Sequence, residues 1–284
     1  MNWFLRYAPH LGYRPPFEVL FPESAGGHDW LSQVDFAADM GFAGVLDAAA
    51  RSRPVGEQAQ VGDRLTKRGL SAGCVLYTTF DKLRSTIWGD TGDASRLAIT
   101  HELLAAIDTA RRIGSTRLAI LGGADAQRPL STQRQALIEN LQFAADLAEP
   151  SGMTLCLETI SRQSVPNMLL HHIADAHAIV KAVGRSSVRL IFDTAHVQSM
   201  DGNVLHHLDA AWDAIEIVQI ADHPGRTEPG SGEIRFDDVW RELGRRGYGG
   251  LVELEHGWVT PGLDSERRGI DTLRRLDALA ASAQ

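Results

Sequence analysis

The segment MTLCLE at residues 153–158 and three similar segments that follow it decide the fold. Each is a short apolar run of the β type that reaches a polar residue at its end: VRLIFD (188–193), IEIVQI (215–220) and LVELE (251–255). Helical patterns follow the four runs, at residues 165–183, 196–212, 236–246 and 264–281. Because neighbouring parallel strands need a crossover connection, usually a helix, this alternation predicts a parallel sheet.

The first half of the chain repeats the alternation. We expect strands at residues 3–8, 43–47, 71–77 and 116–121, and helices at residues 28–40, 56–68, 94–113 and 131–149. Eight strand–helix units in 284 residues, with no linker between the halves, predict an α/β fold. Specifically, they predict a (β/α)8 TIM barrel that forms a single domain over residues 1–284. An open sheet would need a glycine-rich phosphate turn after its first strand, and residues 9–16 contain one glycine.

Composition and charge restrict the function classes. The net charge of -8, with 28 basic against 36 acidic residues, argues against a nucleic-acid partner. No apolar run approaches the ~18 residues of a membrane span, and residues 1–20 lack a signal-peptide pattern. Cys74 and Cys156 lie in apolar strand-like runs, so we expect neither a disulfide framework nor a zinc cluster. These features indicate a cytoplasmic protein whose partner is a small molecule.

Polar residues end the last four expected strands: Glu158, Asp193, Gln219 and Glu255. Barrel enzymes carry out their chemistry at the C-terminal ends of the strands. Side chains alternate along a strand, so Glu158 shares its inward face with Cys156, while Leu155 and Leu157 face the helices. Converging carboxylates repel one another unless their pKa values rise or a cation lies between them, and oxygen ligands suit Mg²⁺ or Mn²⁺. We therefore predict one divalent metal ion held by these four side chains, although Asp193 could instead cap the helix that begins near His196.

Four segments carry a resemblance to a known family. They are LCLE (155–158), FDTAH (192–196), QIADHPGRTEPGSGEI (219–234) and GYGGLVELE (247–255). In these segments the chain resembles the xylose-isomerase-like TIM barrel superfamily, and most closely its hydroxypyruvate isomerase branch. The long third segment is the most specific. The similarity is good over residues 90–284 and loose before them.

The resemblance implies roles for individual residues. The positions that match Glu158, Asp193, Gln219 and Glu255 hold one divalent metal ion, and the two glutamates act as acid and base. The positions of His196 and Arg226 bind the substrate. His10, at the end of the first expected strand, is a further candidate for lining the pocket. The implied activity is isomerisation or epimerisation of a small sugar or hydroxy-keto acid through an enediolate.

Some residues depart from the family pattern or leave their role open. Glu253 has the inward parity of Glu255 one layer deeper, so it could support the ligands or compete as one. His223 stands where the family usually has asparagine. Asp47 ends the second strand, where it could contact the substrate or stabilise a local turn. Trp88 and Trp258 could wall the site or pack on the barrel rim.

Other functions start from the same residues. A dehydratase or lyase of a keto-polyol, like inosose dehydratase, would begin with the same proton abstraction and then expel a hydroxyl group. A metal-dependent phosphodiesterase of the apurinic-endonuclease type is disfavoured, because the second and third strands end near Asp47 and Tyr77 without a histidine. A sugar-binding protein without activity would not need both glutamates. The sequence leaves a homo-oligomer open.

Overall fold

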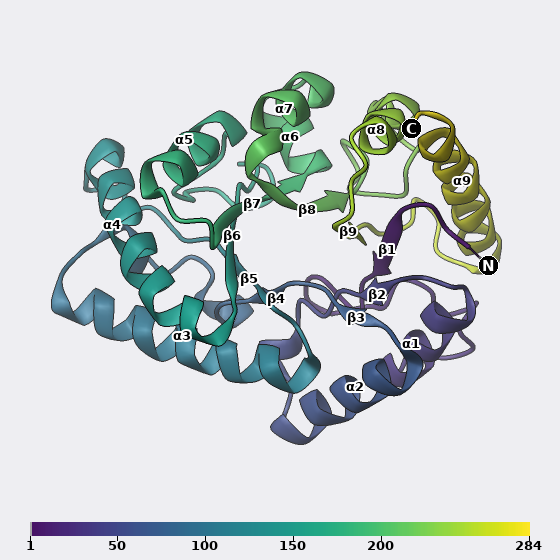
Figure 1. Cartoon of the computed structure of the whole chain (residues 1–284), viewed down its shortest axis with the longest axis horizontal. Helices are drawn as coiled ribbons and strands as arrows, with labels where there is room; N and C mark the ends of the chain where they lie inside the picture. Colours follow the sequence, from purple (N-terminus) through teal and green to yellow (C-terminus); the bar gives the residue numbers. More distant parts are fainter. Residues whose placement is uncertain (1) are drawn as a thin grey trace.

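The structure is a computed structural model that describes residues 2–284. Its strands form a ring with the helices outside them (Figure 1). The strands are β1 (Arg6–Pro9), β2 (Gly44–Val45), β3 (Ser71–Ala72), β4 (Val75–Leu76), β5 (Arg117–Ile120), β6 (Thr154–Glu158), β7 (Val188–Asp193), β8 (Ile215–Ile220) and β9 (Leu251–Leu254). The α-helices are α1 (Trp30–Asp39), α2 (Val55–Arg68), α3 (Asp93–Ile113), α4 (Leu130–Ala148), α5 (Ile173–Val183), α6 (Thr194–Met200), α7 (Val204–Ala211), α8 (Phe236–Arg245) and α9 (Leu263–Ser282).

Backbone hydrogen bonds close the ring. Seven strands form a parallel sheet in the order β1-β9-β8-β7-β6-β5-β4, and β2 pairs with β3 in a second parallel sheet. The N–H of Ala43 donates to Tyr7 O and the N–H of Leu46 to Pro9 O, both at 2.9 Å, which joins β2 to β1. Since β3 and β4 are consecutive pieces of one expected strand, the two sheets together make a closed barrel. The predicted TIM barrel is confirmed.

Side-chain alternation divides the core into two layers, as predicted. Leu155 and Leu157 belong to the large apolar layer between the strands and the helices. Cys156, Ile191 and Ile217 belong to a separate cluster inside the barrel. Burying a large aliphatic side chain contributes about 1.5–3 kcal/mol, so these layers hold the strand ends in place. Both cysteines are free and buried, as expected.

The third expected strand is interrupted at Gly73 and Cys74. The Cys74 N–H donates to Oε1 of Glu253, a residue on the opposite side of the barrel, at 2.8 Å. A Cβ at Gly73 would lie 2.6 Å from the same oxygen, so only glycine leaves room for it. The carboxylate of Glu253 therefore separates β3 from β4.

One expected helix begins too early. We predicted a helix over residues 165–183, but α5 begins at Ile173. The backbone of Asn167 has φ 60, and its carbonyl accepts from Ala124 N at 2.7 Å, so the chain runs across the barrel mouth here. Pro166 also disfavours a helix through this point because it lacks an N–H. Residues 159–172 are therefore a loop beside the strand ends.

Glycine and asparagine set other helix ends. Gly114 ends α3 with φ 81, as predicted. The expected helical stretch 196–212 is two helices, because Gly202 and Asn203 both have positive φ between α6 and α7. The remaining differences from the expected helix bounds are a few residues at most. Within residues 2–284, no helix has the length and apolar character needed to cross a membrane.

Candidate active site

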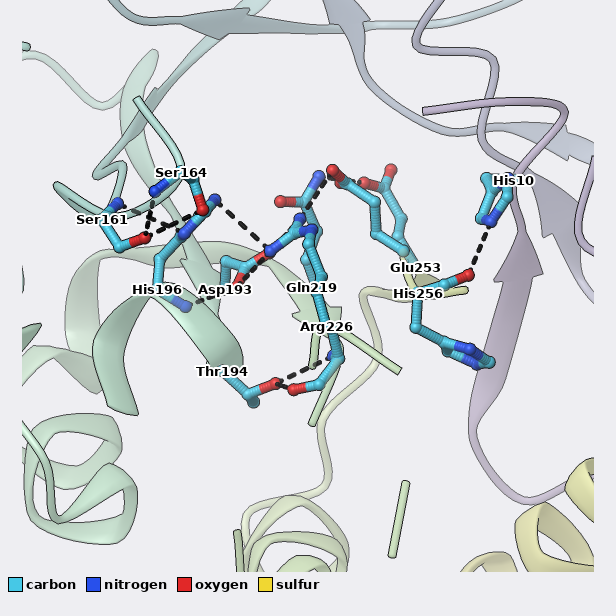
Figure 2. Close-up of polar contacts among 12 residues, drawn as sticks. His10, Ser161, Ser164, Asp193, Thr194, His196, Gln219, Arg226, Glu253 and His256 are labelled. Atoms are coloured by element: carbon cyan, nitrogen blue, oxygen red, sulfur yellow. Dashed lines mark hydrogen bonds and ion pairs between the residues drawn. The ribbon is translucent and has the colours of Figure 1, made fainter. Parts of the chain in front are cut away.

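The C-terminal strand ends surround a cavity of about 480 Å³. Five of its polar side chains come from the second half of the chain: Glu158, His196, Gln219, Arg226 and Glu255. Asp193 pairs with Gln219 in the strand register, which places β7 and β8 side by side at this level. In Figure 2 the side chains of Asp193, Gln219 and Arg226 converge on one region. The four strand-end residues that we predicted as ligands are thus placed around one volume, with Asp193 buried at its edge.

Glu253 sets the orientation of Gln219. Its Oε2 accepts from Nε2 of Gln219 at 2.9 Å, and its Oε1 accepts from the Cys74 N–H at 2.8 Å (Figure 2). An ionised carboxylate only accepts hydrogen bonds, so the amide of Gln219 turns its NH₂ toward Glu253 and its oxygen away. That oxygen is buried and has no hydrogen-bond partner among the described residues. Of the two roles left open for Glu253, the geometry supports the deeper, supporting one.

Arg226 reaches into the cluster of carboxylates. Its Nη2 donates to Asp193 Oδ2 at 2.9 Å and to Glu255 Oε1 at 2.8 Å. The guanidinium carbon lies 5.3 Å from the centre of the Tyr13 ring, a cation–π distance. Arg226 is therefore held by two of the predicted metal ligands and by an aromatic face.

Asp222 folds the loop that carries Arg226. Its carboxylate is fully buried and accepts from four backbone N–H groups, at distances from 2.8 to 3.1 Å: those of His223, Gly230, Gly232 and Ile234. The Asp222 N–H also donates to Thr227 O at 2.8 Å. These bonds bend residues 222–234 into a compact loop. Arg226 lies in it with φ 52, a conformation that an unsupported arginine rarely adopts.

Asp193 has both of the roles considered for it. Its Oδ1 accepts from the His196 N–H at 2.9 Å, so it caps α6, and its carboxylate also binds Arg226. The cap places the His196 ring in the cavity, where Nδ1 accepts from the Ser161 N–H at 3.3 Å. The other ring nitrogen, Nε2, lies 3.4 Å from Nη1 of Arg226. Burial lowers the pKa of His196 to about 4, so the ring is neutral near pH 7.

Burial and mutual repulsion set the protonation of the carboxylates. Burial, followed by the charges of Glu255 and Asp193, raises the pKa of Glu158 well above its ordinary value. Burial raises the pKa of Glu255 to about 8, although Arg226 opposes the rise. Burial would also raise the pKa of Asp193, but Arg226 and His196 outweigh it and lower that pKa. The two glutamates thus have carboxyl groups that can hold or release a proton near neutral pH.

The donor set fits a divalent cation. Glu158, Asp193 and His196 each offer one ligand atom, and these atoms lie within 4.8 Å of one another. The unpartnered Oε1 of Gln219 adds an amide oxygen that faces away from Glu253. Oxygen-rich sets with a neutral imidazole suit Mg²⁺, Mn²⁺ or Zn²⁺. Glu255 lies outside the group of three, with Oε1 bound to Arg226.

Several predicted residues lie elsewhere. Both ring nitrogens of His10 are bound to backbone, Nε2 to His256 O at 2.9 Å and Nδ1 to Gly12 N at 3.0 Å, so His10 offers no nitrogen to this site (Figure 2). It lines a neighbouring cavity of about 650 Å³ instead. Asp47 is buried and bound by the Arg53 guanidinium at 2.9 Å, which is the local role.

The aromatic and histidine candidates are also outside the cavity. Trp88 is fully buried against Tyr77, with ring centres 5.4 Å apart. Trp258 donates from Nε1 to Leu20 O at 2.7 Å and packs on the rim. The Nδ1 of His223 lies 3.1 Å from Glu233 Oε1 on the outside of its loop. None of the three lines the cavity of about 480 Å³.

The sequence reasoning missed three contributors. Tyr13 and Cys74 line the cavity, and Asp222 shapes the loop of Arg226. Tyr13 lies in an irregular loop and Cys74 in a strand interior, where the pattern carries no sign of a site. Asp222 had a signal: an aspartate directly before a segment rich in glycine and proline is typical of a side chain that bonds to nearby backbone N–H groups.

Known proteins with the same fold are similar to this chain in sequence and structure. The family described as "Xylose isomerase-like TIM barrel" matches residues 34–276. The 2-oxo-tetronate isomerase of Haemophilus influenzae is 30% identical over 241 residues, which cover 83% of this chain and 92% of that protein. The hydroxypyruvate isomerase of Escherichia coli is 29% identical, covering 81% of this chain and 89% of that protein. The crystal structure of a family 2 AP endonuclease from Brucella melitensis superposes with a TM-score of 0.79 at 23% identity, covering 95% of this chain and 98% of that one. At that identity the last match shows a shared fold only.

Proposed function

Since this chain belongs to the xylose isomerase-like TIM barrel family and is an isomerase, we propose that it transfers a proton within a small hydroxy-keto compound, with one divalent metal ion. The relatives named above act, by their names, on hydroxypyruvate and 2-oxo-tetronate. Both compounds carry a carbonyl group beside a carbon with a hydroxyl group. We infer the same reacting unit for the substrate of this chain.

One observation carries the proposal. Two buried glutamates, Glu158 at the end of β6 and Glu255 after β9, line one cavity, and each raises the pKa of a nearby carboxyl group or has its own raised. Proton transfer between adjacent carbons needs an acid and a base whose pKa values lie near the working pH. The pair supports that chemistry because one member can enter the reaction ionised while its partner keeps its proton.

The residues divide the work. One glutamate takes the proton from the carbon next to the carbonyl, and its partner supplies a proton to the oxygen or to the neighbouring carbon. Glu158, Asp193, Gln219 and Glu255 would hold the metal ion, with His196 as a further donor. When bound, Mg²⁺ or Mn²⁺ would stabilise the negative charge of the enediolate. Arg226 and His196 would orient substrate oxygens through hydrogen bonds.

The geometry supports more than one fate for the proton. Return to the neighbouring carbon gives aldose–ketose isomerisation, and return to the opposite face of the same carbon gives epimerisation. Loss of a hydroxyl group instead would make the chain a keto-polyol dehydratase. The names of the relatives favour isomerisation.

The test is a product assay in D₂O. Purified protein with Mn²⁺ or Mg²⁺ is incubated with hydroxypyruvate and followed by ¹H NMR. We expect tartronate semialdehyde, with deuterium at the carbon that receives the proton. A Glu158→Gln variant should keep the fold, judged by circular dichroism, and lose at least about 10²-fold in turnover. Near-normal turnover in that variant would remove Glu158 from the acid–base pair, and a product formed by loss of water would favour the dehydratase.

A further inference from the structure

The cavity has one polar face and one apolar face. The ligand cluster and Arg226 occupy the side formed by β6 to β9. The opposite side is apolar and is formed by β2, β4, β5 and the loops that follow the strands: Leu46, Leu76, Phe80, Ala119, Leu121 and Met168. This half offers the reacting centre of a bound molecule nothing to bind. It can only contact the part of the molecule that does not react.

The apolar face is a built surface. Leu76 pairs with Ala119 in the strand register, so these side chains stand next to each other inside the barrel. Met168 lies in the loop that crosses the barrel mouth and pairs there with Gly123. Phe80 packs against Phe17, with ring centres 5.1 Å apart. The face is therefore held by strands and by packed loops on both sides.

Ion pairs fix the loop that carries Phe80. Glu102 of α3 is 7% exposed. It accepts from Lys82 Nζ at 2.6 Å and from Thr78 Oγ1 at 3.0 Å. Arg51 Nη2 adds a bond to the same carboxylate at 2.9 Å. The residues on either side of Phe80 are thus tied to a helix outside the barrel.

Polar groups are displaced from this face. The hydroxyl of Ser164, which lines the cavity, is already bonded to Ser161 Oγ at 2.9 Å. Arg14 and Arg84 also line the cavity, but both are exposed, so they lie at its outer rim. A hydroxyl group buried against leucine and methionine without a partner weakens binding by roughly five-fold or more.

From this division we propose that the substrate is a hydroxy-carbonyl compound whose non-reacting end is an apolar chain, not a chain of hydroxyl groups. The inference rests on the proposed function, since it places the reacting end at the glutamates. It adds that the rest of the molecule lies against Leu76, Ala119 and Leu121. A cavity of about 480 Å³ has room for such a chain beside the reacting end. Each buried methylene should tighten binding by about four-fold until the face is covered.

Three hydroxy-ketones test the inference with the metal-loaded protein. Erythrulose and 1-hydroxybutan-2-one share a carbon skeleton and differ in hydroxyl groups, and 1-hydroxyhexan-2-one extends the alkyl chain. Exchange of the C1 proton in D₂O is measured by NMR, and each kcat/KM is divided by the uncatalysed rate for the same compound. Calorimetry gives the Kd of each. We expect 1-hydroxybutan-2-one to exceed erythrulose by at least about five-fold, and the longer ketone to exceed the shorter by about ten-fold.

Variants locate the preference on the apolar face. Leu121→Asn and Ala119→Ser each add a polar group there, so each should lower the ratio of 1-hydroxybutan-2-one to erythrulose by about five-fold. Leu97→Asn is the matched control, because Leu97 is 72% exposed on α3 and should leave the ratio unchanged. If Leu121→Asn fails to fold by circular dichroism, the smaller Ala119→Ser change decides.

The outcomes separate the two proposals. Exchange of hydroxypyruvate without any preference among the three ketones, or with a preference for erythrulose, overturns the apolar-chain inference and leaves the proposed function standing. No exchange with hydroxypyruvate or with any ketone overturns both. An alkyl preference that the Leu121 and Ala119 variants do not reduce places the chain elsewhere and refutes the assignment to this face.

Discussion

Replacing Glu253 by glutamine should weaken metal binding although Glu253 would not touch the ion. In the native protein the Cys74 N–H occupies Oε1 of Glu253, and the Gln219 amide donates to Oε2 at 2.9 Å. In Glu253→Gln the Cys74 N–H still needs its acceptor, so the introduced amide keeps its oxygen there. Its NH₂ then faces Gln219. Two NH₂ groups cannot bond to each other, so the amide of Gln219 turns over and presents its NH₂ to the cavity.

The magnitude follows from the loss of one oriented ligand. Disturbing a group that orients a metal ligand typically costs about 10–100-fold in metal affinity, or about 1.4–2.7 kcal/mol. The two side chains are nearly equal in volume, so packing changes little. We therefore expect the Kd for Mn²⁺, measured by EPR titration at pH 8, to rise by about 10–100-fold. The thermal midpoint of the metal-free protein should change much less.

Two further variants make the test specific. Glu266 is also fully buried and accepts from two backbone N–H groups, of Glu23 and Ser24, but it lies away from the cavity. Glu266→Gln should leave the Kd for Mn²⁺ unchanged. Combining Glu253→Gln with Gln219→Glu returns an oxygen to the cavity side and should recover most of the affinity. An unchanged Kd in Glu253→Gln, or an equal loss in Glu266→Gln, would refute the orientation argument.

Three other predictions follow from the same structure. Asp222→Ala should cost about 3 kcal/mol in urea unfolding and lower kcat/KM, because several loop N–H groups lose their acceptor and Arg226 loses its place; unchanged values would show that the loop holds its shape alone. Adding Mn²⁺ at 100 times its Kd should stabilise the protein by about 2.7 kcal/mol, and EDTA should reverse this; a midpoint indifferent to both would contradict the metal site. Hydrogen bonds from Lys82 and Thr78 outweigh burial and lower the pKa of Glu102 below its ordinary 4.5. Its stabilisation is therefore present above pH 4.5 and lost as the pH falls through the folded-state value, so the stability difference from Glu102→Gln should shrink in acid urea titrations.

The sequence determined the barrel and the composition of its strand ends. Strand and helix periods, and the inward parity of Glu158 with Cys156, depend on backbone geometry that repeats along the chain, so they could be predicted locally. The same is true of Gly114 at the end of α3. The start of α5 was wrong because Pro166 and the positive φ of Asn167 belong to a loop that bonds to a distant segment.

Only the tertiary structure decided how the strand-end groups are used. Cys74 and Glu253 are 179 positions apart, and their hydrogen bond exists because the barrel closes. The same closure leaves the Gln219 oxygen unpartnered, and the bonds to Asp222 bring Arg226 to Asp193. Periodicity specifies which face a side chain occupies, whereas its partners depend on which distant segments share that face, and this is settled by packing of the whole ring.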